Sequence, residues 1–258
     1  MTLTANPAAA RSAARKTGYG MTTSSMPTSN GQTLAAQLPT RTYEVAALRE
    51  DNSLFIGQSS APAIPLFEDA FSAFTHGSLV QTTMGPVAVE DLQPGDMVQT
   101  STGEAAQLTW IGTSTFSPAD AGKRTPLIRI MPDSLGQSRP ERSLTVGPGA
   151  RILHTPANLR GLADGKQLLT PASKFVDGVN VIEVTPPTPT RLFHICLSRH
   201  AVINVDGIEM ETFHPGSAAP REVSHSLRDR FISLFPRIGH LSDFGPLAHP
   251  RAPEIDIH

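Results

Sequence analysis

The sequence has little that would support cysteine chemistry, stacking of nucleic-acid bases or insertion into a membrane. Cys196 is the only cysteine among 258 residues, which excludes an internal disulfide and a cysteine-based zinc cage. One Trp and two Tyr give few platforms on which single-stranded nucleic acid could stack. No run of 18 or more apolar residues occurs, so we expect no membrane span.

Charge is also sparse and balanced. Charged residues make up 17% of the chain and the formal net charge is −2, so no basic field predicts a nucleic-acid partner. The nine histidines are scattered, and His194 and His200 form the one close pair within the strand-rich region. We therefore expect no metal site and no bound cofactor.

What the sequence has in abundance is short strand-like segments. From residue 77 they follow one another at short intervals, separated by turns such as QPGD, TGE and VDG. Twenty glycines and 23 prolines favour such short strands over long helices, and no helix–strand alternation points to a nucleotide-binding sheet. The prediction is an all-β fold built from many short strands.

The N-terminal side divides into two expected parts. Residues 1–40 lack periodicity, carry Arg11, Arg15 and Lys16 without an acidic residue, and are expected to be a disordered leader. This leader lacks the apolar core of a secretion signal. Residues 41–71 are expected to form a short β or irregular extension, with a hairpin in residues 42–57 and a few helical turns in LFEDAFSAF. Prolines 62 and 65 argue against a strand between them.

The C-terminal residues 217–258 are expected to form a tail with one short helix, at about residues 226–235. Ser226 is the candidate N-cap, with Asp229 three residues on, and Pro236 is the stop signal. The apolar remainder either packs back on the sheet or docks a partner.

Motifs at both ends of the β-rich region identify a family resemblance. The segments are Gly77-Ser78-Leu79, Val89-Glu90-Asp91-Leu92, Pro94-Gly95-Asp96 and Trp110-Ile111-Gly112, and later His194, Arg199, His200, Gly207, Glu211 and Phe213-His214-Pro215-Gly216. In this order they resemble the opening and closing strands of bacterial Hint domains, of the Hedgehog/intein type. The resemblance covers about residues 72–216 and implies a compact Hint-type β fold. Within it, the Pro-Gly-Asp turn has a structural role, because Asp96 can bond nearby backbone N–H groups.

The resemblance also implies a chemistry whose residues are missing. Active Hint domains begin with a Cys that attacks the preceding carbonyl, and a Ser/Thr-x-x-His element acts on the scissile amide. Here the Cys position is Ala73. In the best register the Ser/Thr position is Gly147 and the His position is Ala150. A second register uses Thr155, but then Asn158 replaces the His.

Few neighbouring side chains could replace the missing groups. The hydroxyls of Ser72, Thr75 and Ser78 lie near the cleavage position in sequence, and His154 follows the degenerate motif. His194 and His200 are retained near the site, where we expect them to be hydrogen-bonded structural side chains. Cys196 is expected to be a small buried hydrophobe.

The sequence thus predicts a Hint-fold protein that has lost autoprocessing, leaning away from an enzyme and towards a structural, protein-interaction module. The alternative is a self-cleaving domain that cuts near residue 72 by an acyl shift. The expected partner is protein, either another chain or a second copy, contacted through the tails 1–40 and 217–258. The default location is the bacterial cytoplasm, and export without a conventional signal stays open.

Overall fold

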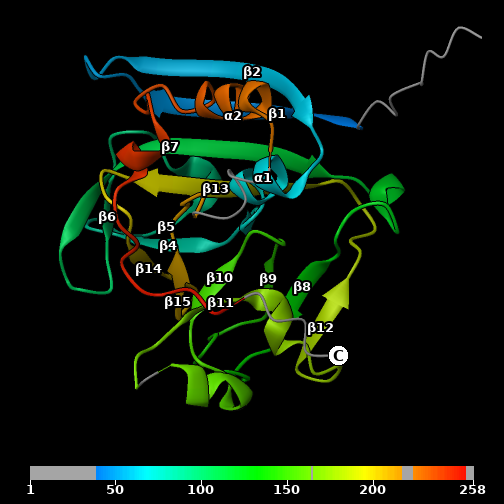
Figure 1. The fold of residues 1–258 in the computed structure, drawn as a ribbon. Coiled ribbons are helices and arrows are strands. Elements are labelled where there is room, and N and C mark those ends of the chain that lie inside the picture. Colours follow the sequence, from blue (N-terminus) through cyan, green and yellow to red (C-terminus); the bar gives the residue numbers. More distant parts are fainter. Residues whose placement is uncertain (1–38, 164, 217–222, 254–258) are drawn as a thin grey trace, which may run out of the picture. The chain divides into compact units, whose positions relative to one another are not determined.

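The computed structural model describes residues 39–163, 165–216 and 223–253 (Figure 1). Short strands dominate this part of the chain, which confirms the predicted all-β class. The strands are β1 (Thr40–Leu48), β2 (Leu54–Pro62), β3 (Phe74–Thr75), β4 (Leu79–Thr82), β5 (Gly85–Ala88), β6 (Met97–Gln99), β7 (Ala105–Phe116), β8 (Leu127–Ile130), β9 (Leu144–Val146), β10 (Arg151–Leu153), β11 (Leu169–Pro171), β12 (Val181–Val184), β13 (Thr190–Leu197), β14 (Val202–Val205) and β15 (Ile208–Glu211).

Short helical elements lie between these strands and after the last of them. The α-helices of the described residues are α1 (Pro65–Glu68) and α2 (His225–Ile232). The 3-10 turns are η1 (Asp69–Phe71), η2 (Val89–Asp91), η3 (Pro118–Asp120), η4 (Ala157–Leu162), η5 (Ala172–Phe175) and η6 (Leu241–Phe244). None of the helices within the described ranges has the length and hydrophobicity needed to cross a lipid bilayer.

Strand β7 is the centre of the hydrogen-bonded network. The main order is β11-β10-β15-β14-β4-β6-β7-β13-β3-β9-β8-β12, with β5 added to β4 and the β1–β2 hairpin added to β7 through β1. The first residues of β7 pair with β6, and from Leu108 onward the strand pairs with β13. Because successive side chains of a strand point to opposite faces, β7 and β13 each face two different cores.

The first core lies among the short strands of the family-like region and is mainly aliphatic. Phe193, Ile195 and Leu197 of β13 belong to it, together with buried Val, Ile and Leu side chains from both ends of the strand order. Ala73 and Ala150 are also members, at 0% and 1% exposure. Burial of these branched side chains is the main stabilising contribution expected of such a sheet.

The second core covers the opposite face of β7 and β13 and is mainly aromatic. Trp110 and Cys196 face it from the two strands. Besides Phe213, its other aromatic side chains come from the segments on either side of the family-like region: Tyr43, Phe67, Phe71, Phe231, Phe235 and Phe244. The Trp110 ring lies 4.5 Å from that of Phe235, and its Nε1–H donates to the Leu234 carbonyl at 2.8 Å. The C-terminal segment therefore packs back on the sheet.

The N-terminal extension is more regular than the sequence predicts. β1 and β2 pair over nine residues each, and β2 continues to Pro62, although prolines at 62 and 65 argued against a strand there. Pro62 closes β2, where a missing backbone N–H is tolerated. α1 and η1 then form the expected helical turns and lead directly into Ala73.

Two local predictions need correction. The N-cap of α2 is Ser224, whose Oγ accepts from the Leu227 N–H at 3.4 Å, and not Ser226. α2 ends at Ile232, before Pro236, because its last turn is followed by non-helical backbone that feeds Leu234 and Phe235 into the second core.

The Pro-Gly-Asp turn behaves as predicted. Asp96 Oδ2 accepts from the Gln93 N–H at 2.8 Å, and Gly95 has a φ of 114°, which only glycine adopts readily. The Gly95 N–H also donates to the Leu108 carbonyl at 2.7 Å, which fixes the turn against β7.

Candidate functional site

Ala73 lies at the meeting point of three strands. It directly precedes β3, its N–H donates to the Phe193 carbonyl of β13 at 2.9 Å, and its own carbonyl accepts from the Gly147 N–H at 2.9 Å. Its methyl group is fully buried in the first core. The fold thus brings the sequence-predicted positions 73 and 147 together, although they are far apart in the chain.

The loop between β9 and β10 is pressed against the backbone just before Ala73. The Gly149 N–H donates to the Ser72 carbonyl at 3.0 Å. A Cβ on Gly147 would lie 2.1 Å from the Ser72 carbonyl oxygen, and one on Gly149 would lie 2.3 Å from the Asp69 carbonyl oxygen. Both distances are far inside van der Waals contact, so only glycine permits this approach.

Ala150 completes the degenerate motif. Its N–H donates to the Gly147 carbonyl at 3.1 Å, and its side chain is buried in the first core. At positions 73, 147 and 150 the side chains are therefore two methyl groups and a hydrogen. None of them can attack a carbonyl, take up a proton or donate one.

The hydroxyls nearest to this point are already engaged or enclosed. Ser72 Oγ donates to the Glu68 carbonyl at 2.6 Å, and Thr75 Oγ1 donates to the Thr145 carbonyl at 2.8 Å. Ser78 is 2% exposed, and its Oγ has no hydrogen-bond partner within the described part of the chain. None of the three is hydrogen-bonded to a base.

The second register finds no catalytic pair either. Thr155 Oγ1 accepts from the Leu168 N–H at 3.0 Å, so this side chain closes a loop. The side chain of Asn158 lies outside the described residues. The ring of His154 packs near that of Phe175, with centroids 5.7 Å apart, and burial lowers the pKa of this histidine.

His194 is buried beside the segment that precedes Ala73. Its Nδ1 lies 2.8 Å from the Asp69 carbonyl oxygen, so the neutral ring carries its proton on Nδ1. Nε2 is buried without a well-formed partner among the described residues. Burial lowers the pKa of His194 to about 4, although the hydrogen bond to Asp69 acts to raise it. At neutral pH the ring is uncharged.

His200 belongs to a different, buried polar cluster. Its Nε2 lies 3.0 Å from Glu211 Oε1, and its Nδ1 accepts from the Ala248 N–H at 2.9 Å. The Nε of Arg251 also donates to Glu211 Oε1 at 3.0 Å. Burial acts to raise the pKa of Glu211, but the hydrogen bond from His200 and the charge of Arg251 outweigh it, so the net shift is downward. The C-terminal segment thus covers His200 through Ala248 and supplies Arg251 as a counter-ion of Glu211.

Sequence reasoning missed two contributors to these arrangements. Gly149 stands inside the degenerate motif, and the GPG spacing is the signal that could have indicated a close backbone approach. Arg251 had no signal, because its pairing with Glu211 spans 40 residues. Across the described ranges, no three His, Cys, Asp or Glu side chains are grouped as ligands of a metal ion.

With this geometry established, comparison with known proteins defines the class. The family model of the Hint domain matches residues 72–217, more than half of the chain. The chain therefore belongs to the Hint domain family.

A solved structure is similar as well: the solution structure of a bacterial intein-like domain from Clostridium thermocellum. It is 15% identical, with a TM-score of 0.38, over 55% of this chain and 99% of that one. No curated protein matches significantly.

Proposed function

We propose that this chain is a Hint-fold domain without autoprocessing activity, which serves as a structural module for contacts with protein. The observation that carries the proposal is the closed centre around Ala73. The carbonyl of Ser72, the one that an acyl shift would attack, is hydrogen-bonded to Gly149 and fills the space of a side chain at position 147.

Chemistry at this carbonyl needs a nucleophile and a proton donor. Uncatalysed attack on an amide is very slow, so a fold without both groups has no route to the acyl intermediate. Ala73 and Ala150 supply neither. His194 is neutral at pH 7, and its Nδ1–H is directed at the Asp69 carbonyl, not at the bond between residues 72 and 73.

The chain upstream of Ala73 is also part of the folded structure. β1 pairs with β7, and the Phe71 carbonyl accepts from Ser114 Oγ at 2.8 Å. Glu68 Oε2 accepts from Arg124 Nε at 2.7 Å, and the Phe71 side chain is fully buried in the second core. A cut after residue 72 would therefore leave two associated fragments, which argues against a role in releasing a leader.

A role in protein contact has support on the surface of the hairpin. Ile56 and Leu54 of β2 are 76% and 52% exposed, and among the described strands β2 pairs only with β1. Most large apolar side chains of residues 223–253 pack in or against the second core, so a partner would mainly meet the polar side chains of this segment. The parts of the proposed contact tails within residues 1–38, 217–222 and 254–258 lie outside the described residues.

The proposal is tested by the intact mass of the full chain, before and after incubation with dithiothreitol or hydroxylamine. A single species of 27.5 kDa, unchanged by either nucleophile, is the expected result. Fragments of 72 and 186 residues would instead establish the self-cleaving alternative. Ser72→Ala and Thr75→Ala variants would then identify the hydroxyl responsible.

A further inference from the structure

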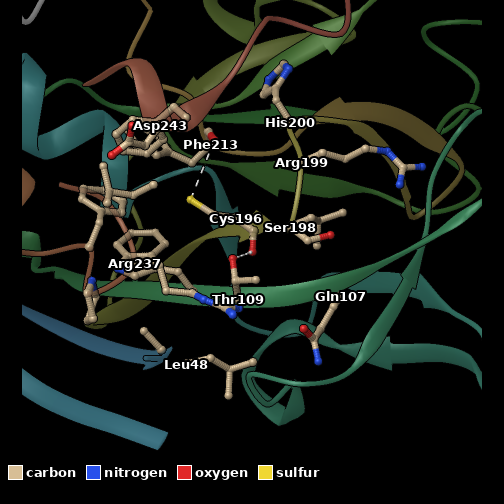
Figure 2. A pocket seen from close by; sticks show the side chains of 17 residues that line it. Leu48, Gln107, Thr109, Cys196, Ser198, Arg199, His200, Phe213, Arg237 and Asp243 are labelled. Atoms are coloured by element: carbon tan, nitrogen blue, oxygen red, sulfur yellow. Dashed lines mark hydrogen bonds between the residues drawn. The ribbon is translucent and has the colours of Figure 1, made fainter. Parts of the chain in front are cut away.

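The second core is incompletely filled at one end, where a pocket of about 350 Å³ opens to the surface (Figure 2). Its wall combines the end of β1, the start of β7, the end of β13 and the C-terminal segment after α2. A pocket of this size falls within the range of small-molecule sites. It is separate from the closed centre at Ala73, since none of residues 73, 147 and 150 lines it.

The inner wall of the pocket is apolar. Trp110, Phe213, Phe235 and Phe244 contribute aromatic surface, and their rings already pack on one another with centroids 4.5 to 6.1 Å apart. Leu48 adds an aliphatic edge. Such a surface favours a compact apolar body, because each buried CH₂ contributes roughly 0.8 kcal/mol. The wall is fixed by internal packing before any ligand enters.

The rim of the pocket carries charges of both signs. Two arginines and one aspartate line it. Arg199 is neutralised by Glu104, at 2.5 Å, and in Figure 2 its side chain extends away from Cys196. Asp243 Oδ2 accepts from the N–H groups of Gly239 and His240, at 3.0 and 2.8 Å, so backbone groups already hold this carboxylate.

Arg237 is the cation without a counter-ion. Its only hydrogen bond among the described residues is a long one, 3.3 Å, from Nη2 to the neutral Asn52 Oδ1, and no carboxylate pairs with it there. It lies on the opposite side of Cys196 from Arg199 (Figure 2). A guanidinium in this position has unused N–H donors that suit a carboxylate.

We propose that this pocket binds a small amphipathic anion, an aryl or branched-alkyl carboxylic acid whose apolar body rests on Trp110 and Phe235 while its carboxylate meets Arg237. Arg237 provides the selectivity for a carboxylate over a neutral head group. The aromatic wall provides the selectivity for an apolar body.

The chain contains its own reporter for this site. Trp110 is the single tryptophan and lines the pocket, so its fluorescence reports occupancy without a label. This readout uses the full chain as it exists.

The experiment is a titration of the full chain with hydrocinnamate and with hydrocinnamyl alcohol, which share one apolar body and differ in charge. Saturable quenching by hydrocinnamate is expected, with the alcohol roughly tenfold weaker. Arg237→Gln should weaken the binding of hydrocinnamate by a similar factor and leave the binding of the alcohol unchanged. Arg129→Gln, an exposed arginine on β8, is the matched control and should change neither.

Two outcomes would overturn the proposal. One is the absence of any saturable change in Trp110 fluorescence with hydrocinnamate. The other is equal binding of acid and alcohol that Arg237→Gln does not alter, which would leave a pocket with no role for charge. Thermal melting of each variant verifies that the fold is intact.

Discussion

The two cores of this molecule lie on opposite faces of the same pair of strands, yet they are built from different side chains and different parts of the chain. The first is aliphatic and drawn from within residues 72–217. The second is aromatic, and most of its large side chains come from segments outside that range. In Figure 1 the β1–β2 hairpin and α2 lie together over β7 and β13. The flanking segments therefore complete the fold.

The two cores also differ in the space that they leave for a ligand or a reaction. Around Ala73 the first core is filled, and main chain meets main chain at Gly147 and Gly149. The second core ends in an open pocket with a charged rim. At positions 73, 147 and 150, to which the family resemblance directs attention, the side chains are two methyl groups and a hydrogen. The proposed binding pocket lies on the other face of the sheet.

The largest expected loss of stability comes from Phe231→Ala in the second core. Phe231 is fully buried, with ring centroids 5.7 Å from Phe67 and 6.2 Å from Phe213. Losing this ring should lower the free energy of unfolding by about 4 kcal/mol, because buried area is lost and a cavity remains. Chemical denaturation, monitored by Trp110 fluorescence, measures this loss in the free energy of unfolding.

The control is Ile56→Ala at an exposed position of the hairpin, which should change the free energy of unfolding by less than about 0.5 kcal/mol. A decrease in the free energy of unfolding of less than about 1 kcal/mol for Phe231→Ala would contradict the stabilising role of the second core. It would mean that α2 is an appendage that does not unfold with the sheet.

The next effect is acid sensitivity from His194, which lies between the two cores. Its pKa is about 4 in the folded state, below the ordinary 6.5, because burial disfavours the charged ring. Above pH 6.5 the His194 imidazole is neutral in both the folded and the unfolded state, so it causes no loss of stability there. Below it, only the unfolded state takes up the proton until pH 4, so up to about 3 kcal/mol of stability should be lost across this window.

His194→Asn removes the titrating group and keeps an N–H donor for the Asp69 carbonyl. The stability of this variant should fall less than that of the parent chain between pH 7 and pH 4, as measured by denaturation at each pH. Parallel pH profiles for the two chains would rule out His194 as a source of acid sensitivity.

A smaller loss of stability is expected from a substitution at the closed centre. Gly147→Ala places a Cβ against the Ser72 carbonyl oxygen, and relieving this contact should cost about 2 kcal/mol. Gly161→Ala is the matched control, because its Cβ would meet nothing within 4 Å and its φ is not positive. Equal midpoints of unfolding for the two variants would show that the loop is not pressed against residue 72.

The sequence predicted features that are local in the chain. The Pro-Gly-Asp turn is specified by three consecutive residues, and Asp96 caps it as expected. The order of short strands followed from turn residues at close spacing. The N-cap of α2 is a local feature that was predicted wrongly, because Ser224 lies only two residues before the predicted Ser226 and their hydroxyls are 3.1 Å apart.

Features that depend on distant pairs could not be predicted in the same way. The approach of Gly147 to Ser72 joins residues 75 positions apart, and only the folded loop shows why glycine is needed. The pairing of Arg251 with Glu211 and the packing of Phe235 on Trp110 link the tail to the family region. Hydrophobic pattern indicates that such residues are buried but does not select their neighbours.

The most direct test of the closed centre is the reactivity of a thiol placed at position 73. Ala73→Cys in a Cys196→Ala background gives a chain whose single thiol stands where active Hint domains keep their nucleophile. Because position 73 is fully buried, we expect no labelling by iodoacetamide in the native chain, one label after unfolding, and no cleavage. Rapid labelling of the native chain, or cleavage between residues 72 and 73, would contradict the account and show that the reaction centre is still open.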